Sequence, residues 1–296
     1  MVSENEITAL IPIHDWSRVK GNLKSVLNLS GISKFNVVLI ADSLSLEEQT
    51  DLVDLASSSQ AKVQVIRFVD FNSAAKSRNI GLCEIHTKYL CFWDSDDLPI
   101  VEGYLSLMEQ MNEKNLDIAI GQLSRVDTSD LKSDASTESN TKDLWDFGMD
   151  PGFTRILYRS EMISKNEFPL ITLAEDLVFL CRVLLVVKKY EIYSTLVYEY
   201  RIGQPTQSTS KFLNPKDQFE AIGMLEDLAE SERREIVKKL ILLIRMKLIL
   251  GLVKRIGRLD LSERRLALKL LVGSLRIRTV LGFIKLKSRS GESLEN

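Results

Sequence analysis

The stretch that decides the fold is Tyr89-Leu90-Cys91-Phe92-Trp93-Asp94-Ser95-Asp96-Asp97-Leu98-Pro99. Its first half is aromatic and apolar, which predicts a buried strand. The run then meets three carboxylates within four positions, followed by a proline that cannot continue a strand ladder. The sequence therefore places Asp94, Asp96 and Asp97 together at the carboxyl end of a strand.

Three carboxylates in such a short segment repel one another unless a positive charge lies between them. Carboxylate oxygens are hard ligands, which suit Mg²⁺ or Mn²⁺. A divalent cation that carries a phosphate is therefore the natural occupant of this segment. A second interpretation is structural, because Asp96 or Asp97 could cap a helix that begins near Ile100.

Upstream of this stretch, a strand-then-helix pattern repeats. Apolar runs at 7–13, 36–41 and 63–66 predict strands, and helices are predicted after them at 17–29, 46–56 and 73–83. With the strand before Asp94, these units predict an α/β fold with a mostly parallel, Rossmann-like sheet flanked by helices. Ligands of such sheets bind beyond the carboxyl ends of the strands, so residues 14–15, 42–43, 71–78 and 94–97 are expected to share one crevice.

Downstream, the pattern predicts a helix at 101–111, a strand at 117–120, strands at 190–194 and 197–201, and polar loops at 128–141 and 205–210. Glu175 and Asp176 begin a strongly apolar helix that runs to about 187. Acids in a first helical turn are also explained by the helix dipole alone. Neither GxGxxG nor GxxxxGK[ST] occurs, so a dinucleotide fold and a P-loop are both disfavoured.

Composition and charge describe a globular chain with a basic end. The 296 residues are 45% hydrophobic and 27% charged. Residues up to 230 hold 22 Lys and Arg against 35 Asp and Glu, whereas 231–290 hold 17 against 4. These basic helices are expected either to contact an anionic membrane surface, to pack against a partner, or to form a bundle with solvated charges. Their single aromatic residue, Phe283, argues against nucleic-acid binding.

Cysteine usage and hydropathy indicate the cytoplasm. Three widely spaced cysteines in apolar runs resemble reduced core residues. The sequence opens without a secretion signal, and its most apolar window is interrupted by Arg245 and Lys247, so no spanning helix is expected. The oligomeric state is not predicted.

The ordered motifs together resemble the landmarks of family 2 glycosyltransferases with the GT-A fold. The resemblance covers roughly residues 6 to 210 and implies an enzyme that moves a sugar from a nucleotide-sugar donor to an acceptor hydroxyl with inversion. The matching motifs are 9–15 (ALIPIHD), 38–43 (VLIADS), 74–82 (AAKSRNIGL), Asp94-Ser95-Asp96-Asp97, Glu175-Asp176 and Tyr200-Arg201.

The resemblance also implies roles for individual residues. Nucleotide-sugar contacts are assigned to Pro12, His14, Asp15, Asp42, Arg78, Asn79, Asp94 and Ser95. Asp96 and Asp94 are the implied metal ligands. Asp176 is the implied catalytic base, with Glu175 as its neighbour. Arg78 is equally explained as a structural ion pair, and Asp42 as a turn residue at a strand end.

Two departures from the family pattern affect these roles. His14-Asp15 stands where many relatives have an aromatic residue followed by Asn, so the nucleobase contact is expected to differ. No histidine follows Tyr200-Arg201, where some relatives supply a further metal ligand.

The resulting prediction is a cytoplasmic, Mn²⁺- or Mg²⁺-dependent inverting glycosyltransferase of polysaccharide or glycolipid biosynthesis. Its expected donor is a nucleotide-diphosphate sugar, with a UDP-sugar favoured, and its acceptor a glycan or lipid-linked glycan. The predicted domains are a catalytic domain at 1–210, with a nucleotide-sugar half at 1–100 and an acceptor half at 101–210, and a basic helical region at 211–296. The alternatives are a nucleotide-sugar binding or scaffolding protein without turnover, and a nucleotidyltransferase, which would need an early glycine-rich loop that residues 13–17 do not offer.

Overall fold

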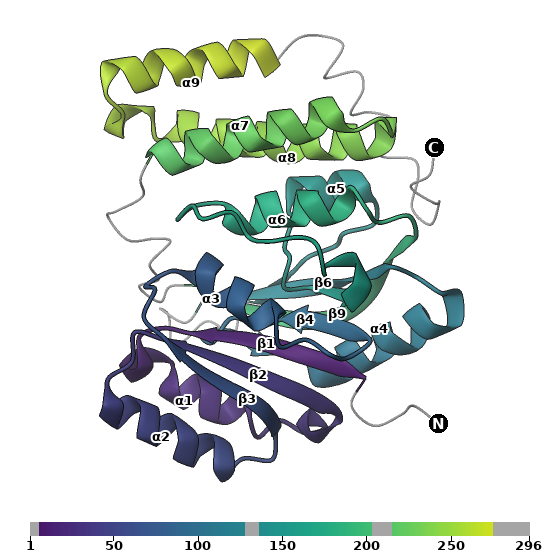
Figure 1. The fold of residues 1–296 in the computed structure, drawn as a ribbon. Coiled ribbons are helices and arrows are strands. Elements are labelled where there is room, and N and C mark those ends of the chain that lie inside the picture. Colours follow the sequence, from purple (N-terminus) through teal and green to yellow (C-terminus); the bar gives the residue numbers. More distant parts are fainter. Residues whose placement is uncertain (1–5, 128–135, 203–214, 275–296) are drawn as a thin grey trace. The chain divides into compact units, whose positions relative to one another are not determined.

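The computed structural model describes residues 6–127, 136–202 and 215–274 (Figure 1). The chain forms two compact units whose segments alternate along the sequence. The first unit comprises Met1–Asn140, Phe153–Phe168 and Tyr193–Gln204; the second comprises Thr141–Gly152, Pro169–Ile192 and Pro205–Asn296. The predicted domain boundary at residue 210 stays a prediction.

A mixed sheet forms the framework of the first unit. Within the described residues its strand order is β3-β2-β1-β4-β8-β6-β9-β5, with β7 beside β6. The strands β1 (Ile7–Ile13), β2 (Phe35–Asp42), β3 (Lys62–Val69) and β4 (Tyr89–Phe92) pair in parallel, as the repeated strand-helix pattern predicts. The α/β class and the sheet flanked by helices are confirmed.

Helices cover both faces of this parallel part, and β1, β2 and β4 are buried on both sides, whereas β3 at the edge of the sheet is partly exposed. Figure 1 shows α1 (Trp16–Val26) and α2 (Leu46–Ser57) below β1 to β3, and α3 (Ala74–Leu82) above them. Alternate residues of β1, from Ile7 to Ile13, join the core that lies between the sheet and helices α1 and α2. Leu10 points the other way, where a Cβ on Gly81 of α3 would come within 2.2 Å of its side chain.

The other half of the sheet is antiparallel. It contains β8 (Ile156–Arg159), β6 (Ile118–Asp127), β7 (Ser136–Glu138), β9 (Tyr190–Ile202) and β5 (Leu98–Pro99). The two strands predicted at 190–194 and 197–201 are one continuous strand, β9. Most of the predicted loop at 128–141 and the whole of that at 205–210 lie outside the described residues.

Helix α4 (Val101–Lys114) follows the acidic stretch directly. Its N-cap residue is Ile100, and no side chain provides a capping hydrogen bond. The interpretation of Asp96 or Asp97 as a cap for this helix is therefore wrong, and these carboxylates need another explanation.

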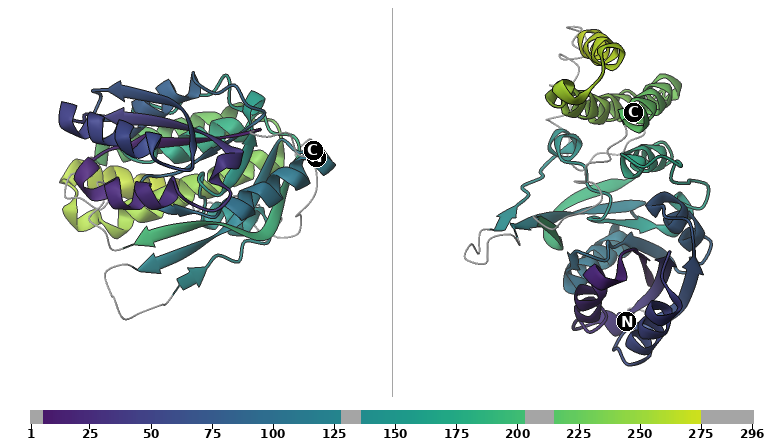
Figure 2. Two further views of the ribbon diagram at one scale, coloured as in Figure 1. Left: turned by 90° about the horizontal axis from the view of Figure 1, so that it is seen from below. Right: turned by 90° about the vertical axis from the view of Figure 1, so that its left-hand side faces the viewer.

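The second unit is helical. It contains α5 (Leu144–Met149), α6 (Glu175–Leu184), α7 (Pro215–Ser231), α8 (Glu235–Lys254) and α9 (Leu261–Ser274). Figure 2 shows α7 and α8 side by side with α9 beyond them. The guanidinium of Arg245, buried in α8, donates to the carbonyl of Ile222 and the hydroxyl of Ser274, which ties the three helices together. The C-terminal helices are confirmed, and none of the helices within the described ranges is long and apolar enough to cross a membrane.

Candidate functional site

The carboxyl ends of the parallel strands meet at one edge of the sheet, and the predicted polar residues of the first unit gather there. Three residues just beyond β1, β2 and β3 have left-handed backbone conformations, namely Asp15 (φ 51°), Ser43 (φ 60°) and Asn72 (φ 47°). Strained backbone of this kind concentrates at functional sites. The edge therefore has the features of a binding site.

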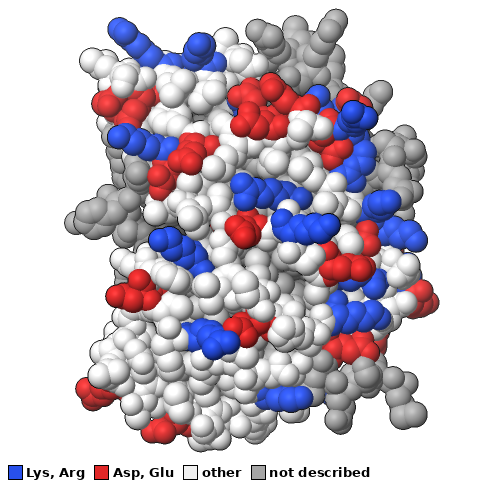
Figure 3. All heavy atoms as spheres, viewed as in Figure 1, with Lys and Arg blue, Asp and Glu red and all other residues white. Residues whose placement is uncertain are grey.

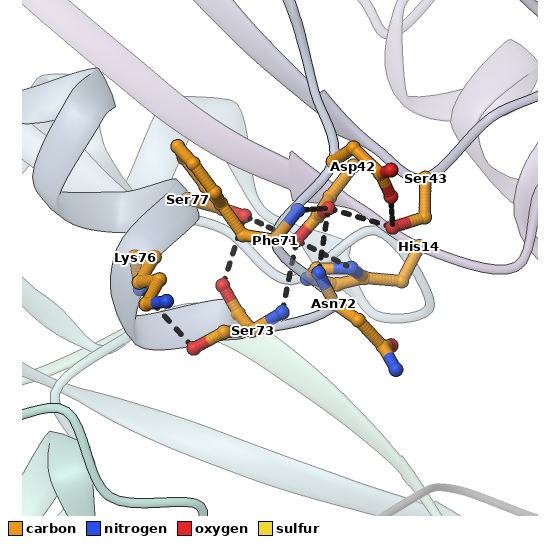
Figure 4. Close-up of polar contacts among 9 residues, drawn as sticks. His14, Asp42, Ser43, Phe71, Asn72, Ser73, Lys76 and Ser77 are labelled. Atoms are coloured by element: carbon orange, nitrogen blue, oxygen red, sulfur yellow. Dashed lines mark hydrogen bonds and ion pairs between the residues drawn. The ribbon is translucent and has the colours of Figure 1, made fainter.

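Asp42 ends β2 and organises the loop that follows β3. Its side chain accepts hydrogen bonds from the backbone N–H groups of Phe71 (2.7 Å), Asn72 (2.9 Å) and Ser73 (2.9 Å), and from the hydroxyls of Ser43 and Ser77, as Figure 4 shows. Burial raises the pKa of Asp42, but these hydrogen bonds outweigh burial and hold the pKa below its usual value. Asp42 is thus an ionised anchor of the loop, which agrees with its interpretation as a turn residue.

His14 lies beside Asp42, with Nδ1 3.6 Å from Oδ2. Burial lowers the pKa of His14, and the charge of Asp42 offsets only part of this effect. The imidazole is therefore neutral near pH 7, when it can both donate and accept a hydrogen bond. Its Nε2 is buried and has no hydrogen-bond partner within the described residues.

Arg78 and Asn79, adjacent on α3, have different environments. The Arg78 guanidinium donates to Asp94 Oδ1 (2.8 Å) and stacks against the rings of Phe153 and Phe168, 4.9 and 5.4 Å from their centroids. The Asn79 amide exchanges two hydrogen bonds with the backbone of Phe168. Asn79 thus holds the backbone at Phe168 in place, whereas Arg78 puts a positive charge beside Asp94.

The acidic segment forms a tight turn, closed by the hydrogen bond from the Asp97 N–H to the Asp94 carbonyl (3.2 Å). Arg18 of α1 lies 3.3 Å from Asp96. Burial and the charge of Asp94 raise the pKa of Asp96. The same two causes raise the pKa of Asp97 to about 8. Burial and the neighbouring carboxylates thus disfavour the charged forms of Asp96 and Asp97 in the absence of a bound cation.

A divalent cation at this turn would need its remaining ligands from a bound molecule. In the part of the chain that is described, no group of three or more His, Cys, Asp or Glu side chains could hold a metal. Asp94 and Asp96 nevertheless offer carboxylate oxygens, and Asp97 Oδ2 is buried without a hydrogen-bond partner there. Mg²⁺ is commonly held by one or two carboxylates and substrate phosphates, so a third protein ligand is not required.

Glu175 and Asp176 belong to the second unit. They form the first turn of α6, after Ala174 in a left-handed conformation (φ 65°). This location is consistent with the helix-dipole explanation. The assignment of Asp176 as the catalytic base stays a prediction.

Sequence patterns missed three residues of the site. They are Arg18, which pairs with Asp96; Asn22, whose side chain donates to the carbonyls of Ser95 and Asp97; and Tyr198, whose hydroxyl accepts from the Asp94 N–H. Arg18 stands three residues after Asp15, a position that could have suggested it. Asn22 and Tyr198 meet the turn only through tertiary folding, so no local signal marks them.

A parallel sheet half with an acidic turn at its carboxyl edge, joined to an antiparallel half, is the GT-A fold of glycosyltransferases. The model of glycosyl transferase family 2 matches residues 8–165, more than half of the chain, and the chain belongs to this family.

Curated relatives agree with this assignment. The poly(ribitol-phosphate) beta-glucosyltransferase of Bacillus spizizenii is 24% identical over 233 residues, which cover 75% of this chain and 36% of that protein. Glycosyltransferase GlyG of Streptococcus pneumoniae is 23% identical over 124 residues, 42% of this chain and 41% of the relative. The chain thus spans about two-fifths or less of the length of these relatives.

Solved structures share the fold at low sequence identity. S. aureus TarS 1-349 in complex with UDP-GlcNAc superposes with a TM-score of 0.74 at 15% identity, covering 92% of this chain and 82% of TarS 1-349. The mannosyltransferase PcManGT of Pyrobaculum calidifontis, in complex with GDP-Man and Mn²⁺, gives a TM-score of 0.55 at 9% identity, covering 97% of this chain and 85% of PcManGT.

Proposed function

We propose that this member of glycosyl transferase family 2 is an active glycosyltransferase that moves a sugar from a nucleotide-diphosphate sugar to an acceptor hydroxyl, with a bound divalent cation and with inversion at the anomeric carbon. The observation that carries the proposal is the partly buried acidic turn at the carboxyl edge of the sheet, where Asp94 and Asp96 face Arg78 and Arg18. A UDP-sugar is the favoured donor, supported by the complex of the TarS fragment with UDP-GlcNAc.

The acidic turn would hold the donor through its charges. Asp96, with Asp94, would hold Mn²⁺ or Mg²⁺, and the ion would stabilise negative charge on the departing diphosphate. Arg18 beside Asp96 and Arg78 beside Asp94 would offset part of the repulsion among the carboxylates before the donor binds. Pro12, His14 and Asp15, at the end of β1, are the proposed contacts of the nucleoside.

Inversion requires a base that takes the proton of the attacking hydroxyl from the face opposite the leaving group. Asp176 is proposed as this base, with Glu175 as its neighbour. Asp176 lies in the first turn of α6, and a carboxylate is a residue type that can accept the proton of an attacking hydroxyl.

The test compares Asp96→Ala and Asp176→Ala, with Asp54→Ala on the exposed face of α2 as control. Titration calorimetry with UDP, in the presence of Mn²⁺ or EDTA, measures nucleotide binding, and donor consumption with a panel of acceptors measures transfer. We expect both site variants to lose transfer and only Asp96→Ala to lose the Mn²⁺-dependent binding of UDP. The reverse pattern would contradict the assigned roles, and wild-type binding of UDP-sugar without consumption would favour a non-catalytic binding protein.

Polysaccharide or glycolipid biosynthesis is the proposed setting, because the curated relative from Bacillus spizizenii is named for glucosylation of a poly(ribitol-phosphate). A glycan or a lipid-linked glycan is the proposed acceptor, and the cytoplasm the proposed location.

A peripheral contact with an anionic membrane surface is proposed for the C-terminal helices. Leu261, Leu268 and Val272 of α9 are 73%, 48% and 71% exposed. They recur at i, i+7 and i+11 and so share one stripe, beside which Arg265 and Lys269 are also exposed. Figure 3 shows blue side chains at the edge formed by α9. An apolar stripe with adjacent basic residues is typical of helices that lie on anionic lipid.

A further inference from the structure

The acidic turn needs support from outside itself. Its one internal backbone hydrogen bond joins the Asp97 N–H to the Asp94 carbonyl at 3.2 Å, which is long for this type of bond. Three carboxylates in four residues repel one another and favour opening of the turn. Contacts from other elements must therefore fix the positions of these carboxylates.

Asn22 of α1 provides two such contacts. Its Nδ2 donates to the carbonyl of Ser95 at 2.9 Å and to the carbonyl of Asp97 at 2.7 Å. A side-chain amide nitrogen carries two hydrogens, so each carbonyl receives one of them. The Asn22 side chain thereby spans the turn, although it lies more than 70 residues earlier in the sequence.

Arg201 of β9 completes the arrangement from the other side. Its guanidinium donates to Asn22 Oδ1, and its backbone N–H donates to Asp97 Oδ1 at 2.9 Å. Glu199 holds the guanidinium through a contact of 3.2 Å to Nε. Every hydrogen-bonding group of the Asn22 amide is therefore used, and the turn is linked to a helix and a strand at once.

We infer that Asn22, held by Arg201, is a positioning residue of the acidic turn. It keeps the Ser95 and Asp97 peptide groups in place, so that Asp94 and Asp96 present their carboxylates in a fixed geometry before ligand binds. Residues that orient metal ligands in this way commonly change metal affinity by about 10- to 100-fold when they are replaced. The inference rests on the proposed function, because the turn is taken to hold a cation with a donor diphosphate.

Two variants of the full chain test the inference. Asn22→Ala removes all three contacts, whereas Asn22→Asp keeps the shape and the acceptor oxygen but cannot donate to the two carbonyls. Asn28→Ala is the matched control, because Asn28 Nδ2 donates to the Lys24 carbonyl and its Oδ1 accepts from the Gln60 N–H, with no contact to the turn. Melting temperature is recorded for each variant.

The first measurement is hydrogen–deuterium exchange of a peptide spanning residues 93–98, without metal or nucleotide. We expect both Asn22 variants to exchange about tenfold faster than the wild type or Asn28→Ala. The second measurement is UDP affinity with Mn²⁺ and with EDTA. The Mn²⁺-dependent gain in affinity should fall at least tenfold in both Asn22 variants, while affinity in EDTA stays unchanged.

The outcomes separate this inference from the proposed function. Wild-type exchange rates in both Asn22 variants would overturn the positioning role, and so would an equal loss of UDP affinity with Mn²⁺ and with EDTA. If the wild type gains no UDP affinity from Mn²⁺, the proposed metal-dependent function fails, while the exchange experiment still decides whether Asn22 holds the turn.

Discussion

At the scale of single residues, the site depends on Asp42, whose two carboxylate oxygens accept from five donors. Asp42→Asn exchanges one oxygen for an NH₂ group, which then faces donors. We expect the variant to lose about 1–3 kcal/mol of unfolding free energy, the usual cost of unsatisfied buried polar groups. Urea denaturation at pH 7 measures the loss. Asp54→Asn, on the exposed face of α2, should change stability by less than about 0.5 kcal/mol.

The loss of unfolding free energy caused by Asp42→Asn should also depend on pH. The pKa of Asp42 is lower in the folded protein than in the unfolded chain, because hydrogen bonds to the carboxylate outweigh burial. Its stabilisation is therefore fully present above the unfolded pKa of about 3.9 and is lost as pH falls through the folded pKa. The stability difference between wild type and Asp42→Asn should be constant above pH 5 and shrink below pH 4. A difference that grows on acidification would contradict the role of Asp42 as an ionised anchor.

At the scale of elements, the acidic turn is held between β4 and α4, and α4 must lie close to β9. A Cβ on Gly103 of α4 would lie 2.2 Å from the carbonyl oxygen of Leu196, a backbone atom that cannot rotate away. Gly103→Ala should therefore displace α4 from β9 and destabilise the protein by about 1–3 kcal/mol, as overpacking usually does. It should also weaken Mn²⁺-dependent UDP binding, because β9 carries Tyr198 and Arg201. Chemical denaturation and calorimetry measure the two effects.

A second helical glycine provides the control for this change. A Cβ on Gly21 of α1 meets no atom within 4 Å, so Gly21→Ala should stabilise the protein by about 0.5–1 kcal/mol through helix propensity. Equal effects of the two substitutions would show that propensity, rather than the contact with Leu196, decides the result at Gly103.

Sequence patterns predicted the elements with strong periodicity and missed those defined by tertiary contacts. The parallel strands and α1 to α4 follow from apolar runs and amphipathic spacing in residues 7–114, and they place the acidic turn at its sheet edge. The sequence predicts two strands, at 190–194 and 197–201, where the structure has the single strand β9. Asn22 was missed because its contacts reach residues more than 70 positions away.

At the scale of the whole molecule, sequence patterns do not predict that the two compact units are built from alternating segments of the chain. Residues 141–152 lie far along the chain from α8, yet Gly148 of α5 packs against Leu240 and Leu243 of that helix. Such a contact requires the two helices to approach closely, and a glycine permits this. No local sequence pattern predicts which helix will lie against Gly148. The boundary predicted at residue 210 follows the end of the family resemblance and the helical pattern after it, and it stays a prediction.

Charge is distributed unevenly along the chain, because residues up to 230 are net acidic and residues 231–290 are net basic. If α9 contacts anionic lipid, the full chain should sediment with vesicles that contain phosphatidylglycerol and not with pure phosphatidylcholine. Arg265→Glu with Lys269→Glu should weaken this binding roughly 30-fold or more, because each basic residue near such a surface contributes about 1 kcal/mol. Leu268→Glu with Val272→Glu should also abolish binding, whereas Val53→Glu, a similarly exposed position of α2, should not. If the chain sediments equally with both kinds of vesicle, or if both double variants still bind, the C-terminal helices do not bind anionic lipid. Their role would then be to pack within the protein.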